Sequence, residues 1–161
     1  MTVREDEVIR SDGSGGIFGV VEKPDFTLVI PYDGQGFYVV EQYRYPVAGR
    51  YVEFPQGSWE EAADVEPLDL ARAELAEETG LRAATMTYLG HLFEAYGYCN
   101  QGFHVFLATD LTQKEQSLTS EEADLQVSYL SITEFREHVL IGRVKDAPTL
   151  AAFALMQLRM G

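Results

Sequence analysis

Short apolar runs rich in β-branched and aromatic residues alternate with turn-forming segments along most of the chain. Such runs occupy residues 26–30, 37–43, 51–54, 85–93, 103–109 and 125–130, and this pattern is typical of strands. Two further short strands are predicted at residues 8–10 and 17–22, on either side of a glycine- and serine-rich turn. Residues 31–36 contain a proline and two glycines, so we predict that they close a hairpin between the strands that flank them.

A helix is predicted directly after the strand at residues 51–54. Glu66 stands at a capping position, Pro67 suits the first helical turn, and Gly80 supplies a left-handed stop. Its apolar stripe consists of Leu68, Ala71 and Leu75. The pattern therefore predicts one amphipathic helix over residues 67–79.

Two more helices are predicted towards the end of the chain. Ser131 and Glu134 match a capping box that would open a short helix. Helical spacing of apolar residues predicts a closing helix over residues 146–160. Strands with two or three helices that do not alternate regularly indicate an α/β (α+β) fold, with helices layered on a mixed sheet.

Composition and charge limit the classes of function. The chain has 161 residues, enough for a single domain over residues 1–161, and no apolar run long enough to span a membrane. Its net charge of −14 argues against nucleic acid or an anionic membrane as a partner. Its single cysteine, Cys99, suits a cytoplasmic protein and, without a nearby histidine or metal spacing, is predicted to be an unreactive thiol.

Three carboxylates, Glu74, Glu77 and Glu78, share one side of the predicted helix. Residues spaced by three or four positions are neighbours on a helix, and like charges there repel each other. A solvated acidic face is the common explanation of such a group, whereas a hard cation such as Mg²⁺ would also use its oxygens. The helix alone leaves both interpretations open.

The flanking residues resemble the signature of the Nudix hydrolase family. Gly57 opens this signature, and residues 74–81, Glu-Leu-Ala-Glu-Glu-Thr-Gly-Leu, close it. Residues 20–24, 41–46, 53–57 and 119–123 are similar to the corresponding stretches of the ADP-ribose pyrophosphatase subgroup. The resemblance covers most of residues 8–160 and implies a Nudix-type α/β/α sandwich with a mixed β-sheet.

The chain departs from the signature at three points. Gly57 and Gly80 are 23 positions apart (80 minus 57), two more than in the family. The middle glutamate of the signature falls on Ala63 or Val65, depending on the register. The signature arginine falls on Ala73, and Arg72 cannot replace it because one residue is about 100° of helical rotation.

The resemblance also implies roles for individual residues. Glu74, Glu77, Glu78 and the backbone carbonyl of Gln56 would hold Mg²⁺ or Mn²⁺, with Glu78 also counted among the catalytic residues. Glu121 or Glu122, on a late acidic loop, would activate water.

On the substrate side, Arg44, Glu53 and Tyr96 are the candidates. Arg44 could contact a diphosphate or simply pair with one of the many acids. Tyr96, like Tyr43, Tyr45 and Tyr98, could stack on a base or belong to the core. His91 and His104 lie on apolar strands and are predicted to be packing or hydrogen-bonded residues.

The implied reaction is hydrolysis of the diphosphate linkage in ADP-ribose or a related nucleoside diphosphate, giving AMP and ribose 5-phosphate from ADP-ribose. The stretch 94–101 lacks the proline and the acidic pair common in ADP-ribose-cleaving members, so dinucleoside polyphosphates and nucleotide sugars stay open as substrates. Ala73 also leaves open a catalytically weakened nucleotide-binding module. By resemblance we expect a homodimer, with the strands near residues 8–22 at its interface.

Overall fold

A computed structural model describes residues 1–58, 65–113 and 124–160 of the chain. Within these residues the strands form three sheets, in the orders β1-β2, β6-β3-β8-β7 and β5-β4-β9. The strands are Thr2–Ile9 (β1), Gly15–Glu22 (β2), Phe26–Pro31 (β3), Gly36–Arg44 (β4), Gly49–Glu53 (β5), Gln56–Gly57 (β6), Leu81–Phe93 (β7), Gly102–Gln113 (β8) and Gln126–Ser131 (β9). The helices are Pro67–Thr79 (α1), Ile132–Leu140 (α2) and Ala147–Met160 (α3), with a short 3-10 turn at Tyr45–Val47 (η1).

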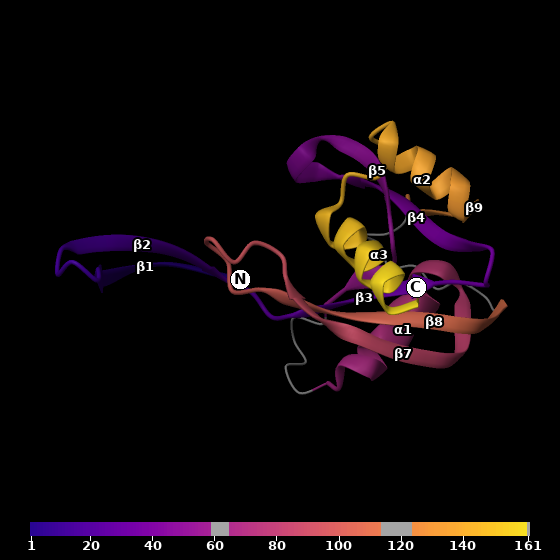
Figure 1. The fold of residues 1–161 in the computed structure, drawn as a ribbon, viewed down its shortest axis with the longest axis horizontal. Helices are drawn as coiled ribbons and strands as arrows, with labels where there is room; N and C mark the ends of the chain where they lie inside the picture. Colours follow the sequence, from indigo (N-terminus) through magenta and orange to yellow (C-terminus); the bar gives the residue numbers. More distant parts are fainter. Residues whose placement is uncertain (59–64, 114–123, 161) are drawn as a thin grey trace.

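The four-stranded sheet is the centre of the molecule and carries helices on both faces (Figure 1). β3 pairs in parallel with β8, whereas β6 and β7 pair antiparallel with their neighbours. Leu28 and Ile30 join the core cluster that includes Met156 of α3, and Val29 between them joins the cluster that includes Leu75 of α1. Side chains that alternate between two apolar layers explain why β3 reads as a continuous hydrophobic run. The predicted α/β/α arrangement around a mixed sheet is confirmed.

Aromatic side chains fill the larger of the two core clusters. Phe37 of β4 is fully buried. Its ring centroid lies 5.2 to 5.8 Å from those of four neighbours, Tyr32, Phe54, Phe135 and Phe153. Phe135 belongs to α2 and Phe153 to α3, so this packing holds both helices against the sheets.

The predicted hairpin between β3 and β4 is wrong. β3 pairs with β6 and β8, β4 pairs with β5 and β9, and a single bridge between Tyr32 and Phe37 joins the two segments. The turn itself is present, because the Asp33 carboxylate accepts hydrogen bonds from the backbone N–H groups of Gln35 and Gly36 at 2.9 Å each. After this turn the chain enters a different sheet, a choice that no local signal specifies.

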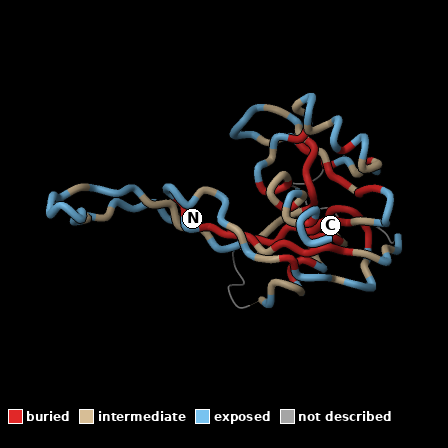
Figure 2. The backbone as a smooth tube through the Cα atoms, viewed as in Figure 1, coloured by how far each residue is buried: buried red, intermediate tan, exposed pale blue. Residues whose placement is uncertain are grey.

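The first two strands form a ribbon that projects away from the rest of the molecule (Figures 1 and 2). β1 begins at Thr2, six positions (8 minus 2) before the predicted start at Val8, so the first prediction was too short. Polar residues occupy most of the added length, and Arg4 pairs there with Asp6 and Glu22. A two-stranded ribbon exposed on both sides needs no apolar alternation, which is why the pattern missed it.

The predicted helix signals are confirmed at α1 and α2. α1 begins at Pro67 and stops at Gly80, whose φ of 68° is left-handed, although the Glu66 side chain makes no capping hydrogen bond. The Ser131–Glu134 capping box at α2 is complete in both directions. No described helix is both long and apolar enough to cross a membrane.

Candidate functional site

The carboxylates of α1 lie against the short edge strand β6. Glu74 and Glu78 are buried, with exposed fractions of 5% and 2%, and Glu77 is partly exposed. The backbone N–H of Gln56 donates to Glu78 Oε2 at 3.2 Å. A helix that begins at Pro67 puts these residues on one side at i, i+3 and i+4, as the sequence pattern predicts. The structure shows that this side faces β6.

Gly57 allows this close approach between strand and helix. A methyl group in place of its hydrogen would lie 2.5 Å from Glu74 Cδ and 2.6 Å from Glu74 Oε1, far inside normal contact. Glycine is therefore required at this position by the closeness of the Glu74 carboxylate, and not by the backbone conformation of residue 57.

A second set of polar residues surrounds Glu53 at the end of β5. Glu53 is 2% exposed, and its carboxylate forms a fork with Arg44, with Nη2 to Oε1 at 2.6 Å and Nε to Oε2 at 3.3 Å. Gln42 donates to Oε1 at 2.9 Å and Gln56 donates to Oε2 at 3.2 Å. Three partners (Arg44, Gln42 and Gln56) thus hold the carboxylate in place, and the two-bond pair holds the arginine at one orientation, because a bidentate pair fixes the guanidinium plane.

The pKa of Glu53 is raised above its usual range. Burial is the largest cause, Arg44 opposes the rise, and the nearby Asp146 adds to it. Asp146 lies close because Gln56 Nε2 also donates to its Oδ2 at 3.2 Å. Gln56 thus connects the Glu53 network with the first residue before α3.

An open cavity of about 700 Å³ adjoins both sets of residues. Glu53, Gln56 and Gly57 line it. Three cations from separate parts of the chain also line it, namely Lys23, Arg44 and Lys145. Three acids, Glu53, Glu94 and Asp146, line it too, so its charged residues balance, whereas the chain as a whole carries a net charge of −14.

The structure places the remaining predicted residues in different surroundings. Tyr96 is 82% exposed and does not line the cavity, whereas its neighbour Tyr98 does. Tyr43 and Tyr45 are exposed as well, so none of these tyrosines belongs to the core. Glu121 and Glu122 lie outside the described residues.

Arg72 does not take over from the missing signature arginine. Its side chain is 54% exposed and lies 3.8 Å from Asp69 on the outer side of α1. Arg72, next to Ala73, therefore points away from the carboxylates of α1, as the helical rotation predicts.

Sequence reasoning missed Gln42, Lys145 and Asp146 as residues of this region. Asp146 also accepts the backbone N–H of Thr149 at 2.8 Å, which caps the start of α3. An aspartate three residues before a helical threonine is a recognisable capping signal, but nothing local indicates that its carboxylate also reaches Gln56. Lys145 lies 5.1 Å from the centre of the Tyr51 ring, a contact that depends on tertiary structure alone.

A model of the NUDIX domain matches residues 23–153. The chain is 32% identical over 151 residues to the ADP-ribose pyrophosphatase of Mycobacterium tuberculosis, covering 92% of this chain and 72% of that protein. It is 29% identical to the methanol dehydrogenase activator of Bacillus methanolicus, covering 96% of this chain and 83% of that protein. The crystal structure of an ADP compounds hydrolase superposes with a TM-score of 0.82 at 17% identity, covering 99% of this chain and 93% of the other.

Proposed function

Because the chain belongs to the Nudix family, we propose that it is a divalent-metal-dependent pyrophosphatase acting on ADP-ribose or a related nucleoside diphosphate. With ADP-ribose, water would attack one phosphorus of the diphosphate, and cleavage of the bridging P–O bond would give AMP and ribose 5-phosphate. The observation that carries the proposal is the contact of two buried α1 carboxylates with Gln56 and Gly57, beside a cavity whose lining includes three cations and three acids.

The residues at this contact fit a hard cation. Glu74 and Glu78 offer buried carboxylate oxygens, and the close approach at Gly57 brings the β6 backbone to the same place. We propose that Glu74, Glu77, Glu78 and the Gln56 carbonyl would hold Mg²⁺, or Mn²⁺ in its place, because oxygen ligands are the set that these ions prefer. Bound there, the metal would neutralise charge that develops on the phosphate oxygens.

The other residues of the cavity would bind and orient the substrate. We propose that Arg44 contacts the diphosphate through the N–H groups that Glu53 does not use, and that Lys23 and Lys145 add positive charge. Glu53 is nearly fully buried, so it acts by positioning Arg44. Tyr98 at the cavity wall is better placed than Tyr96 to contact a base. Activation of water remains assigned to Glu121 or Glu122.

We also propose that two chains associate through the β1–β2 ribbon. An isolated two-stranded ribbon is marginally stable in water. This one exposes large apolar side chains, with Ile9 at 84% and Ile17 at 65%. A second copy would cover these residues. If the ribbon of one chain reaches the substrate site of the other, activity depends on the dimer. Dilution below the dimerisation constant should then lower the specific activity, whereas a monomeric protein would keep it.

Turnover with a panel of substrates tests the activity. The protein is incubated with ADP-ribose, nucleotide sugars and diadenosine polyphosphates, with Mg²⁺ or Mn²⁺, and nucleotide monophosphate release is measured. ADP-ribose should give the highest kcat/KM. Absence of product with every substrate would leave only the nucleotide-binding alternative, and a preference for another substrate would correct the assignment.

A matched pair of variants on α1 tests the metal residues. Glu78→Gln removes a buried carboxylate charge and should reduce kcat by at least about 100-fold, because the electrostatic stabilisation of the phosphate oxygens is lost. Glu66→Gln makes the same chemical change at an exposed residue of the helix start that makes no capping bond, and should keep normal activity. Normal hydrolysis by Glu78→Gln would refute the metal assignment.

A further inference from the structure

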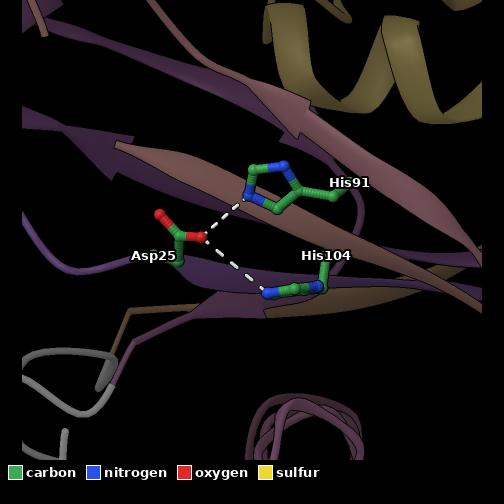
Figure 3. Close-up of side chains that lie close together, drawn as sticks. All are labelled: Asp25, His91 and His104. Carbon is green, nitrogen blue, oxygen red and sulfur yellow. Dashed lines mark hydrogen bonds and ion pairs between the residues drawn. The ribbon is translucent and has the colours of Figure 1, made fainter. Parts of the chain in front are cut away.

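Two histidines and an aspartate converge on the sheet outside the cavity. His91 of β7 and His104 of β8 are direct cross-strand partners, and Asp25 precedes β3. His91 Nε2 lies 2.8 Å from Asp25 Oδ2, and His104 Nε2 lies 3.8 Å from the same oxygen. Figure 3 shows both rings turned towards this carboxylate. One ligand atom from each residue lies within 4.8 Å of the other two.

The surroundings hold each of these side chains in place. Asp25 uses its other oxygen, Oδ1, to accept the backbone N–H of Gly102 at 2.8 Å, which leaves Oδ2 to face the histidines. Tyr88 Oη lies 3.2 Å from His104 Nδ1. The hydroxyl oxygen can accept a hydrogen bond from Nδ1–H, which leaves the lone pair of Nε2 available to a metal. A side chain at Gly102 would overlap the His91 ring, so the glycine provides the space that the imidazole occupies.

A neighbouring buried hydroxyl is unsatisfied at the same face of the sheet. Thr27 pairs with His104 in the parallel ladder between β3 and β8, so both side chains point to the α1 side. Thr27 is 1% exposed, and its Oγ1 has no hydrogen-bond partner among the described residues. A buried hydroxyl without a partner is uncommon and needs an explanation. Water bound to an ion held by His104 and its neighbours would provide one.

We propose that Asp25, His91 and His104 form a binding site for a divalent transition-metal ion, of which Zn²⁺ is the best match. Two imidazoles and one carboxylate, with a position left for water, are a ligand set that Zn²⁺ uses with open coordination. In a tetrahedral site neighbouring ligand atoms are about 3.3 Å apart, between the 2.8 and 3.8 Å observed here.

This site would select a different class of metal from the carboxylates of α1. Imidazole nitrogen suits Zn²⁺ and its neighbours, whereas an all-oxygen set suits Mg²⁺ and Mn²⁺. None of Asp25, His91 and His104 lines the cavity. Side chains that are 25% to 42% exposed leave the site open to ions from solvent. An ion there would tie the start of β3 to β7 and β8 without taking part in hydrolysis.

Metal titration of the intact chain tests the site. The protein is stripped with a chelator and kept in excess Mg²⁺ to occupy the oxygen ligands, and Zn²⁺ binding is then followed by calorimetry. One equivalent should bind, and Zn²⁺ at about one hundred times the dissociation constant should raise Tm by about 5 to 10 °C. Co²⁺ in place of Zn²⁺ should give the visible absorption of a four-coordinate ion with nitrogen ligands. No uptake of Zn²⁺, or a Co²⁺ spectrum of an all-oxygen octahedral site, would overturn the proposal.

Variants then locate the bound ion. His91→Asn and Asp25→Asn should each weaken Zn²⁺ binding by at least about 100-fold, while Mg²⁺-dependent turnover is retained. His138→Asn is the matched control, because His138 is the third histidine of the chain and lies on α2. It should bind Zn²⁺ as the parent does, as should Glu78→Gln. Zn²⁺ binding that survives His91→Asn and Asp25→Asn, or that disappears in Glu78→Gln, would place the ion elsewhere and refute this site.

Discussion

Replacing Gly57 by alanine tests whether the contact between β6 and α1 sets the position of the carboxylates that we propose bind the metal. The new methyl group would lie 2.6 Å from Glu74 Oε1 and 2.5 Å from Glu74 Cδ. Ordinary contact between such atoms begins near 3.5 Å, so the carboxylate must withdraw by about 1 Å. The φ angle of Gly57 is not positive, so the backbone itself accepts alanine and the effect is confined to this contact.

A displacement of this size should affect activity much more than stability. Misplacement of a catalytic group by about 1 Å can cost about 100-fold in rate, so kcat/KM with ADP-ribose should fall by roughly that factor. Overpacking against the end of a side chain costs about 1 kcal/mol, which lowers Tm by only about 2 to 4 °C for a chain of this size. Because Glu74 is a proposed metal ligand, a higher Mg²⁺ concentration should be needed for half-maximal activity.

The assay measures kcat/KM at several Mg²⁺ concentrations, with Tm by calorimetry on the same samples. Gly97→Ala is the control, because a methyl group at Gly97 would meet nothing within 4 Å and its φ is not positive either. It should match the parent in both measurements. A Gly57→Ala variant with parental kcat/KM and parental Mg²⁺ dependence would refute the reasoning, because Glu74 could then move without consequence.

Three further predictions concern the Glu53 network and the core. Arg44→Lys replaces a two-bond contact by a point charge and should lower kcat/KM by about 10- to 100-fold, the equivalent of one charge-assisted hydrogen bond; an unchanged value would remove Arg44 from the substrate site. Burial raises the pKa of Glu53, so its stabilising contribution is fully present below the ordinary glutamate pKa and is lost as the pH rises through the raised one. The Tm difference between the parent and Glu53→Gln should therefore shift in favour of the parent as the pH falls, and a difference that stays flat with pH would contradict this. Phe37→Ala empties the centre of the aromatic cluster and should destabilise the protein by about 3 to 5 kcal/mol, or about 6 to 20 °C in Tm, whereas Leu158→Ala, at a residue 83% exposed, should change Tm by less than about 2 °C.

The sequence predicted the elements whose causes are local. Pro67 and Gly80 bound α1, and the Ser131–Glu134 box opens α2, because a fixed φ, a left-handed residue and a side-chain cap act within a few positions of the chain. Helical periodicity likewise puts Glu74 and Glu78 on one side of α1. The family resemblance and these signals together were enough to predict the Nudix fold, and they are the source of the proposed metal ligands on α1.

Tertiary structure decided what depends on contacts between distant segments. The turn at Asp33 is visible in the sequence, but only the packing of both sheets sends β4 away from β3. Lys23, Arg44 and Lys145 reach one cavity because three separate strand ends and loops meet there. No spacing in the sequence predicts that meeting.

The clearest case is the group formed by Asp25, His91 and His104. Read singly, the two histidines are predicted to be ordinary residues of apolar strands, and Asp25 carries no signal. Antiparallel pairing of β7 with β8 places the histidines side by side, and the parallel pairing of β3 with β8 brings Asp25 to them across 66 positions of sequence. The amino-acid sequence thus determined the helices and the carboxylate face of α1 through short-range interactions. Strand order and register determined which side chains meet on the sheet, because they join residues that are far apart in the chain.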